Sequence, residues 1–244
     1  MKLQGAVAIV TGASTGIGRA IAQTLAGHGA RIGIVGRNTE GLRLTEKVVA
    51  KSGGEARMFI ADLRDQRALE RIAVEVEDTW GGADIIVNVA GVWHDGQKVY
   101  YGPDLAKTPV EQIDEVLEVG IRAPMQLTRL LLPHMIERKR GKILNISGTF
   151  SSGGAGWLHY YVSKKALESF TVGLADELRK HEIQVNCISP SDVATEALSR
   201  FFPEDAEKAL APADVAELAR LLLDEGVADH ITGQIVVIKC KSAH

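Results

Sequence analysis

A tyrosine and a lysine four residues apart form the clearest chemical pattern in the chain, and the spacing occurs twice, as Tyr160/Lys164 and Tyr161/Lys165. Positions i and i+4 share one face of a helix, so each lysine ammonium can lie beside its tyrosine phenol. A free phenol has a pKa of about 10, and a neighbouring positive charge lowers it. Such a pair can give a proton to, or take one from, an oxygen on a reacting carbon. The two pairs face directions about 100° apart, so one site uses only one of them.

A second pattern lies near the start of the chain, where an apolar run ends in the glycine-rich segment T-G-A-S-T-G-I-G at 11–18. Its spacing is G-x-x-x-G-x-G, not the G-x-G-x-x-G of the common dinucleotide fingerprint. Glycines let the backbone turn tightly and approach a pyrophosphate, which the free N–H groups of a helix start can bind. A glycine-rich turn that binds no ligand could have the same sequence pattern. The position between a first strand and a first helix favours a nucleotide-binding loop.

Short apolar runs alternate with longer helical patterns, and these elements must position both motifs. Expected strands cover 6–10, 32–35, 58–60, 85–89, 142–146, 185–188 and 234–238, and expected helices about 17–27, 40–52, 66–80, 109–137, 160–180 and 213–224. Continuous apolar strands are typical of parallel sheets that are covered on both faces. The sequence therefore predicts an α/β fold, a Rossmann-like doubly wound parallel sheet of about seven strands, in a single domain over 1–244.

The two motifs together resemble the classical short-chain dehydrogenases/reductases, and the resemblance continues to about Val237. That family's pattern is close to Y-x-x-S-K-x-A-L, and only the Tyr160 register places Ser163 directly before the lysine. The resemblance implies hydride transfer between a nicotinamide dinucleotide and a carbonyl or secondary alcohol carbon. It makes Tyr160 the general acid/base, and Lys164 its pKa-lowering partner and a ligand of the nicotinamide ribose.

The third catalytic member in the family is a serine that hydrogen-bonds the substrate oxygen, thirteen residues before the tyrosine. Ser147 stands at that distance from Tyr160 and is favoured by the spacing. The family's run is usually I-S-S or I-G-S with the second residue catalytic, whereas this chain has I-S-G. By strand alignment Gly148 would then hold the slot, and Thr149 would be the nearest hydroxyl.

The cofactor contacts that the resemblance implies are spread over six segments. They are Gly12, Ser14, Thr15, Gly16, Ile17 and Gly18; Arg37 and Asn38; Asp62 and Leu63; Asn88, Ala90 and Gly91; and Pro190, Val193 and Thr195, together with Tyr160 and Lys164. Glycine stands at position 36, where an acidic residue would bind the ribose of NAD, and Arg37 follows. Arginine can pair with a 2′-phosphate, so NADP(H) is favoured and NAD(H) stays open. Asn88 is expected to be structural more than catalytic.

Gly120 lies in the middle of the long helix expected at 109–137. The family usually carries an asparagine at this position. In the family that asparagine holds a water between the lysine and solvent, so the proton relay is altered here or activity is impaired. A helix-interior glycine costs about 1 kcal/mol relative to alanine, so Gly120→Asn is expected to keep or raise stability. The opposing expectation is that the glycine makes room for a bulky neighbour. Pro124 predicts a kink nearby.

Aromatic residues suggest a substrate pocket walled by Trp93, His94, Trp157 and Phe201, although loop hydrophobes that simply pack on the domain explain them as well. Three functions stay open. The first is a carbonyl reductase or alcohol dehydrogenase, and the second is a 3-oxoacyl-(acyl-carrier-protein) reductase with Arg122 and Arg129 as its basic patch. The third is a non-catalytic dinucleotide sensor, against which the intact tyrosine–lysine pair argues.

Composition sets the remaining expectations. A net charge of −3 gives no electrostatic reason to expect nucleic acid or an anionic membrane as partner. No stretch approaches the roughly 20 apolar residues of a membrane span, and two cysteines are too few for a disulfide framework, so a cytoplasmic protein is expected. The histidines lack metal-ligand spacing, and no metal is expected. The long helices at 109–137 and 160–180 resemble those that pair in the family's homodimers and homotetramers.

Overall fold

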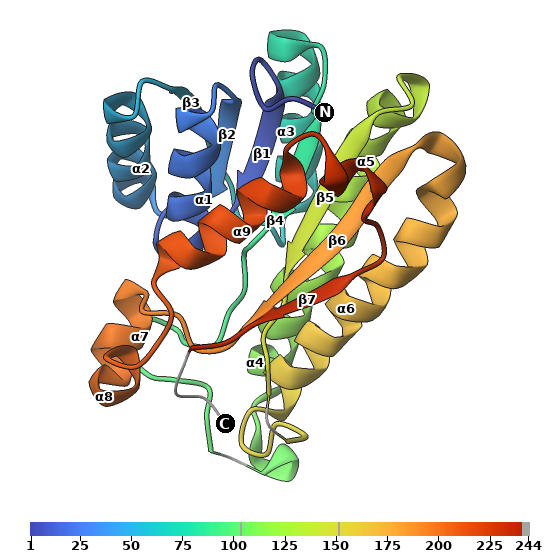
Figure 1. Cartoon of the computed structure of the whole chain (residues 1–244). Helices are drawn as coiled ribbons and strands as arrows, with labels where there is room; N and C mark the ends of the chain where they lie inside the picture. The colour runs from blue at the N-terminus through green and yellow to red at the C-terminus, as the bar shows by residue number, and fades with distance from the viewer. Residues whose placement is uncertain (103, 151, 241–244) are drawn as a thin grey trace.

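The computed structural model describes residues 1–102, 104–150 and 152–240, which form one seven-stranded sheet between two layers of helices (Figure 1). All strand pairs are parallel, and the order is β3-β2-β1-β4-β5-β6-β7. The strands are β1 (Val7–Thr11), β2 (Arg31–Gly36), β3 (Glu55–Ile60), β4 (Ile85–Asn88), β5 (Gly141–Ile146), β6 (Ile183–Pro190) and β7 (Ile235–Ile238). The prediction of a doubly wound parallel sheet is confirmed.

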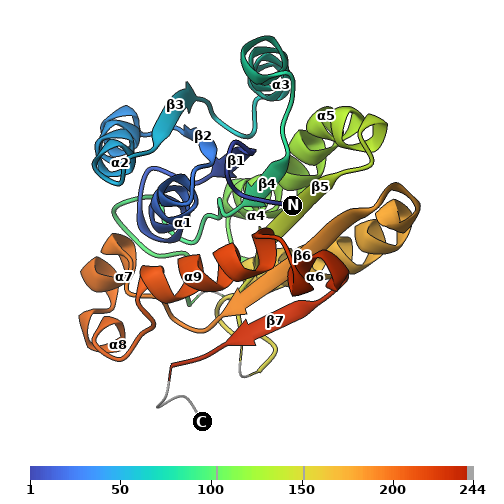
Figure 2. The ribbon, with the colours of Figure 1, turned by 45° about the horizontal axis from the view of Figure 1, so that its top comes forward.

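Helices cover both faces of this sheet, α1, α2 and α9 on one side and α3, α5 and α6 on the other (Figure 2). Their bounds are α1 (Gly16–Gly27), α2 (Thr39–Lys51), α3 (Gln66–Trp80), α4 (Val110–Leu117), α5 (Ala123–Glu137), α6 (Leu158–Leu178), α7 (Glu196–Phe201), α8 (Pro203–Ala206) and α9 (Pro212–Leu223). Shorter helical turns are η1 (Leu105–Lys107), η2 (Glu118–Arg122), η3 (Arg179–His181) and η4 (Val227–His230). Within the described residues, no helix is long and apolar enough to cross a bilayer.

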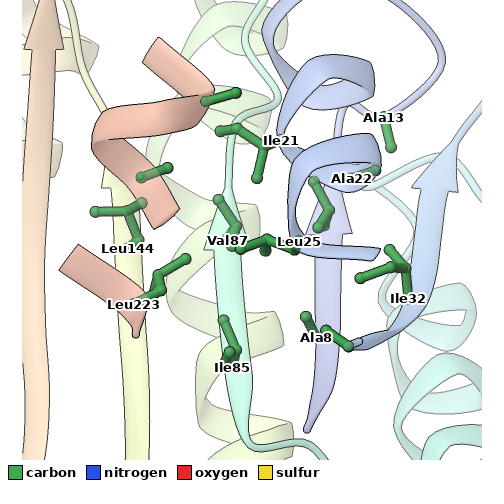
Figure 3. Close-up of a cluster of buried hydrophobic side chains, with 14 of the residues drawn as sticks. Ala8, Ala13, Ile21, Ala22, Leu25, Ile32, Ile85, Val87, Leu144 and Leu223 are labelled. Atoms are coloured by element: carbon green, nitrogen blue, oxygen red, sulfur yellow. The ribbon is translucent and has the colours of Figure 1, made fainter. Parts of the chain in front are cut away.

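The strands read as continuous apolar runs because both of their faces are buried. Every residue of β1 and of β5 is buried, and alternate side chains enter two separate cores. In one core Ile21 and Leu25 of α1 meet Val87 of β4 and Leu223 of α9 (Figure 3). This apolar burial, at about 25 cal/mol per Å², fixes the helices against the sheet and so fixes the loops that leave the strand ends.

Strand order reverses direction between β1 and β4, which are neighbours in the sheet although two strands separate them in the chain. The loops after β1 and β4 therefore leave in opposite directions and open a crevice at the carboxyl ends of the strands. In open α/β sheets ligands bind in this crevice. The glycine segment follows β1, and the segment from Val89 follows β4, so both predicted binding motifs meet there.

The expected long helix at 109–137 is not continuous. It consists of α4, a π-helical turn η2 and α5, with Pro124 in the first turn of α5. The break was predicted at the proline, and the structure places it just before, around Gly120. The short helices α7 and α8, which were not predicted, lie together after β6, beside the start of α9 (Figure 1).

Candidate active site

A cavity of about 560 Å³ lies at the carboxyl ends of the strands and brings together most of the predicted cofactor residues. Its lining includes Gly12, Ser14, Thr15, Gly16, Ile17, Gly18, Arg37, Asn38, Asp62, Leu63, Ala90, Gly91, Tyr160, Lys164 and Thr195. Pro190 and Val193 line a second, adjoining cavity instead. Asn88 lines neither, because its side chain donates to Asn145 Oδ1 at 2.9 Å inside the sheet.

The glycine segment has the cradle shape that a pyrophosphate needs. Gly12 has a φ of +64°, and a Cβ there would stand 3.0 Å from the Cα of Ala90. A Cβ at Gly18 would collide with the backbone of Gly12 and Ala13, so only glycine allows α1 to start so close to β1. The cradle, its place at the start of α1 and the size of the cavity fit a dinucleotide.

A carboxylate already lies at the start of α1. Glu196 of α7 accepts hydrogen bonds from Gly16 N at 3.0 Å and Thr15 Oγ1 at 2.5 Å, and it pairs with Arg19 at 2.6 Å. Burial opposes its ionisation, but the hydrogen bond from Thr15 leads a group of contacts that lower the pKa of Glu196 overall. This carboxylate occupies a position where the helix dipole favours an anion. Sequence reasoning missed it because Glu196 comes from a short helix with no periodic signal.

Arg37 lies at the far end of the same cavity, half-exposed and close to two carboxylates. Its Nη1 is 3.5 Å from Glu115 Oε1 and 3.9 Å from Asp62 Oδ2. Asp62 also pairs with Arg64 at 2.7 Å, and the hydrogen bond from Arg64 lowers the pKa of Asp62 against the effect of burial. Glu115, on α4, is a cavity residue that the sequence analysis did not identify.

Helix α6 presents the Tyr160 register of the tyrosine–lysine motif to the cavity. Tyr160 and Lys164 both line it, and Lys164 Nζ lies 5.4 Å from the Tyr160 ring centroid while donating to Ile146 O at 3.0 Å. The other pair points elsewhere. Tyr161 packs edge-on against Phe150 and lines neither cavity, and Lys165 pairs with Glu168 at 2.8 Å.

The electrostatics of this pair differ from the expectation. Burial, with a smaller contribution from Asp192, raises the pKa of Tyr160, whereas the motif predicted that Lys164 would lower it. Burial also lowers the pKa of Lys164 to about 8. Lys164 is only 3% exposed, so the loss of hydration explains the lowered pKa of its ammonium.

The hydroxyl groups near Tyr160 are engaged away from the cavities. Ser147 lines both cavities, but its Oγ donates to Glu168 Oε1 at 2.9 Å. Thr149 Oγ1 donates to Ser189 O at 2.8 Å, and Ser189 Oγ in turn donates to Glu168 at 3.2 Å. A hydroxyl has one hydrogen, so in this arrangement neither Ser147 nor Thr149 donates to a substrate oxygen. Gly148 also lines the second cavity, without a side chain.

The second cavity, of about 450 Å³, adjoins the first along Tyr160, Ser147, Trp93, Ile17 and Thr195, which line both. Of the predicted pocket residues, it contains Trp93 and Trp157. His94 lines the first cavity instead, and Phe201 lines neither, although its ring lies 5.9 Å from that of Trp93. The lining residues that the sequence analysis did not place in any site or motif are Leu198 and Asp205, and the lining also includes Phe150, Phe202, Ser191 and Asp192.

No group of three or more His, Cys, Asp or Glu side chains suited to a metal ion occurs among the described residues. The two adjoining cavities, with a phenol between them and an ammonium behind it, can place a dinucleotide and a second molecule on either side of one proton donor. This geometry suits transfer between a bound cofactor and a small molecule.

Comparisons with known proteins agree with this geometry. The model of the short chain dehydrogenase family matches residues 6–206. Nodulation protein G of Rhizobium sp. (strain N33) is 31% identical over 96% of both chains. The 3-oxoacyl-(acyl-carrier-protein) reductase FabG of Aquifex aeolicus (strain VF5) is also 31% identical, over 97% of this chain and 96% of its own length.

Solved structures give the same result. A metagenomic short-chain oxidoreductase in complex with NADP matches with a TM-score of 0.84 and 32% identity over 99% of both chains. A protein from Beutenbergia cavernae with bound NADP matches with a TM-score of 0.86 and 30% identity, over 98% of this chain and 96% of its own. The chain therefore belongs to the short-chain dehydrogenase family and is an NAD(P)-dependent oxidoreductase.

Proposed function

We propose that this protein uses NADP(H) to interconvert a small carbonyl compound and its secondary alcohol, with Tyr160 as general acid/base. One observation carries the proposal: Tyr160 lines both the cavity that fits a dinucleotide and the adjoining cavity. A carbonyl in the second cavity can therefore face the cofactor and the phenol at once. When bound, the nicotinamide supplies or accepts the hydride.

The chain's own residues handle the proton. In the reducing direction the Tyr160 hydroxyl gives its proton to the developing alkoxide, and Lys164 favours the phenolate that results. The Lys164 ammonium, with a pKa of about 8, is mostly charged at neutral pH and lies 5.4 Å from the ring centroid. Burial of the Lys164 ammonium removes competing water and strengthens this attraction. The Ser147 hydroxyl stays hydrogen-bonded to Glu168, and the Thr149 hydroxyl stays hydrogen-bonded to Ser189.

The preference for NADP(H) is supported by Arg37 and by the absence of a carboxylate at Gly36. Two NADP-bound relatives share the fold at 30–32% identity. Glu115 and Asp62 lie within 4 Å of Arg37 and partly neutralise it, so a 2′-phosphate has to replace them as its partner. Titration of tryptophan fluorescence with NADPH and NADH checks the preference, and equal affinities or tighter NADH binding would reject it.

The decisive variant pair is Tyr160→Phe and Tyr161→Phe. Tyr160→Phe is expected to abolish reduction across a panel of ketones, because it removes the proton donor, and to leave NADPH affinity nearly unchanged. Tyr161→Phe keeps the cavity intact, because Tyr161 packs against Phe150 and lines neither cavity, and is expected to keep most activity. Steady-state rates and cofactor titrations of both variants measure this. The opposite ranking would place the Tyr161/Lys165 pair at the site.

A second candidate is favoured by the relatives: reduction of a 3-oxoacyl group on a carrier protein, as in FabG. The structure gives it little electrostatic support. Arg122 pairs with Glu118 at 3.5 Å, and neither Arg122 nor Arg129 lines either cavity. Comparing a 3-oxoacyl-carrier protein with a small ketone decides between the two. A non-catalytic sensor would bind NADPH and turn over neither.

We further propose that the protein forms a homodimer or homotetramer. Apolar side chains that lie on α5 and α6 are 41–47% exposed: Met125, Leu158, Val162 and Val172. An exposed apolar surface of this kind is typical of a protein–protein contact. Light scattering on a size-exclusion column measures the mass directly, and a monomer at micromolar concentration would reject the proposal.

A further inference from the structure

The second cavity carries charge of one sign. Asp192, in the loop after β6, and Asp205, on α8, both line it. Among the lining residues that the structure describes, there is no lysine, arginine or histidine. Neither carboxylate forms an ion pair with another described residue. A ligand that enters the cavity therefore meets two negative charges and no positive one.

Aromatic rings form a wall of the same cavity. Trp93, Trp157 and Phe202 lie with their ring centroids 6.2–6.3 Å from one another. Tyr160 continues the wall, 6.3 Å from Trp157 and 6.1 Å from Phe150. The faces of aromatic rings attract cations, and tryptophan does so most strongly. Exposed carboxylates occur on most protein surfaces and do not by themselves indicate a ligand. Two carboxylates that share a cavity of about 450 Å³ with an aromatic wall favour an organic cation.

The two carboxylates also disfavour ionisation of neighbouring groups. Burial, with a smaller contribution from Asp205, raises the pKa of Asp192, and Asp192 contributes to the raised pKa of Tyr160. A positive charge between these groups would relieve both effects, because it stabilises the carboxylates and the phenolate together. A neutral or anionic ligand would leave both effects in place or strengthen them.

We propose that the substrate of this enzyme carries a positive charge, a protonated amine or a quaternary ammonium group, held between Asp192, Asp205 and the aromatic wall. The proposal rests on the function proposed above and specifies its substrate class. The carbonyl carbon accepts the hydride from the reduced cofactor, the carbonyl oxygen takes the Tyr160 proton, and the cationic group keeps its charge throughout. Substrates with a carboxylate or phosphate near the carbonyl are excluded by the same charges.

Binding without turnover gives the first test. Choline and 3,3-dimethylbutan-1-ol have the same shape and differ only in the charge of the quaternary centre. At saturating NADPH, which cannot oxidise an alcohol, quenching of Trp93 and Trp157 fluorescence reports occupancy of the cavity that they line. We expect choline to bind about tenfold or more tightly than the neutral alcohol, and Asp192→Asn to remove the difference. Glu204→Gln is the matched control, because it removes one charge from α8 outside the cavity, and it should keep the preference.

Kinetics give the second test, with three ketones of one shape: (2-oxopropyl)trimethylammonium, 4,4-dimethylpentan-2-one and 2,2-dimethyl-4-oxopentanoate. Their intrinsic reactivities differ, so the quantity compared is the ratio of kcat/KM for cationic and neutral ketone in each protein. We expect this ratio to fall about tenfold in Asp192→Asn, with a smaller fall in Asp205→Asn and no change in Glu204→Gln.

The outcomes separate the two proposals. If the neutral or anionic ketone is reduced and its ratio to the cation is the same in wild type and Asp192→Asn, the charge preference is wrong and the reductase stands. If no ketone is reduced but choline binding still depends on Asp192, the cation site stands and the proposed reaction is wrong. Equal binding of choline and its neutral isostere overturns the cation site whatever the kinetics show.

Discussion

At the scale of single residues, Lys164 is held where its charge is least stable. Its side chain is 3% exposed, and its ammonium donates to the carbonyl of Ile146 at 3.0 Å. Burial lowers its pKa to about 8 from 10.5. The unfolded chain therefore binds this proton more tightly than the folded chain does, so folding is penalised at pH 7. The penalty disappears as the pH rises from 8 towards 10.5, where stability increases.

Lys164→Met is expected to make the protein more stable and inactive. At pH 7 the pKa difference corresponds to about 3 kcal/mol, and the lost hydrogen bond to the Ile146 carbonyl returns about 1 kcal/mol of this. A net gain of about 2 kcal/mol should raise Tm by about 4–8 °C in a chain of this size. Denaturant unfolding at pH 7 and pH 10 measures it, and the gain should shrink at pH 10. Lys165→Met, on an exposed side chain, should show no such gain.

The space around Gly148 allows a specific prediction for a serine at this position. A Cβ there would have its nearest neighbours at 3.8–3.9 Å, from Phe150 and Lys164, and the backbone lies outside the left-handed region. Gly148→Ser therefore fits without strain and places a hydroxyl in the cavity, near Lys164. We expect turnover to rise about tenfold or more, because a donor aimed at a developing oxyanion is worth at least that much. Gly148→Ala is the control, and equal rates for the two variants would show that the slot needs no hydroxyl.

Parts of the site could be predicted from the sequence and parts could not, for a physical reason. The spacing of Tyr160 and Lys164 follows one helix, and the Tyr160 register was predicted from the residues that flank the pair. The orientation of the Ser147 hydroxyl depends on Glu168 of α6 and Ser189 of β6, which no local pattern connects. Asp192 and Asp205 come from a loop and a four-residue helix, so their shared cavity has no sequence period to indicate it.

At the scale of elements, strands were predicted well because burial on both faces gives continuous apolar runs. The first strand was expected at 6–10 and is Val7–Thr11. The short helices α7 and α8 were missed because six and four residues are too few to show a helical period. The π-helical turn at η2 was only partly predicted, because it depends on how closely this segment packs against α6.

Gly120, in η2, faces Ser163 of α6 at close range. A Cβ at Gly120 would stand 2.8 Å from Ser163 Oγ and 3.0 Å from its Cβ. Ser163 is 1% exposed, and its hydroxyl donates to the Tyr160 carbonyl, so a shift of this side chain costs that hydrogen bond or disturbs the packing of α6. The expectation that Gly120→Asn keeps or raises stability is therefore withdrawn, and the alternative of a steric requirement is favoured.

Gly120→Ala is expected to destabilise the protein by up to about 2 kcal/mol, since an overpacking cost of about 1–3 kcal/mol exceeds the gain in helix propensity of about 1 kcal/mol. Turnover should fall as well, because α6 carries Tyr160. Gly173→Ala supplies the matched control: Gly173 lies in α6, and a Cβ there meets nothing within 4 Å, so stability should rise. Melting curves of the two variants should therefore shift in opposite directions. A rise for Gly120→Ala would show that α6 has room to adjust.

At the scale of the whole molecule, contacts between distant segments hold the end of the sheet opposite the cavities. Lys142, the second residue of β5, is 1% exposed and lies 2.8 Å from Asp229 in η4. The same ammonium donates to the backbone carbonyl of Asp224. These contacts join the middle of the sheet to the segment between α9 and β7. The two contacted residues of that segment lie 82 or more positions after Lys142 in the chain. Sequence alone gave no sign of this pair, because lysine at a strand start reads as an exposed residue.

Asp229→Asn is expected to cost about 1–3 kcal/mol, between the values for exposed and for buried ion pairs, because Lys142 keeps a buried charge while Asp229 is 37% exposed. Burial opposes ionisation of Asp229, but hydrogen bonds from Lys142 and the amino terminus lower its pKa to about 2. A depressed folded-state pKa gives stability that is present above pH 4 and is lost as the pH falls towards 2. Acid unfolding of wild type should therefore be steeper in that window than that of Asp229→Asn.

Asp224→Asn, which leaves the carbonyl contact intact, should change stability by less than about 1 kcal/mol. Lys142→Met combined with Asp229→Asn should recover most of the loss; a double variant as unstable as Asp229→Asn would show that the carboxylate stabilises η4 independently of Lys142.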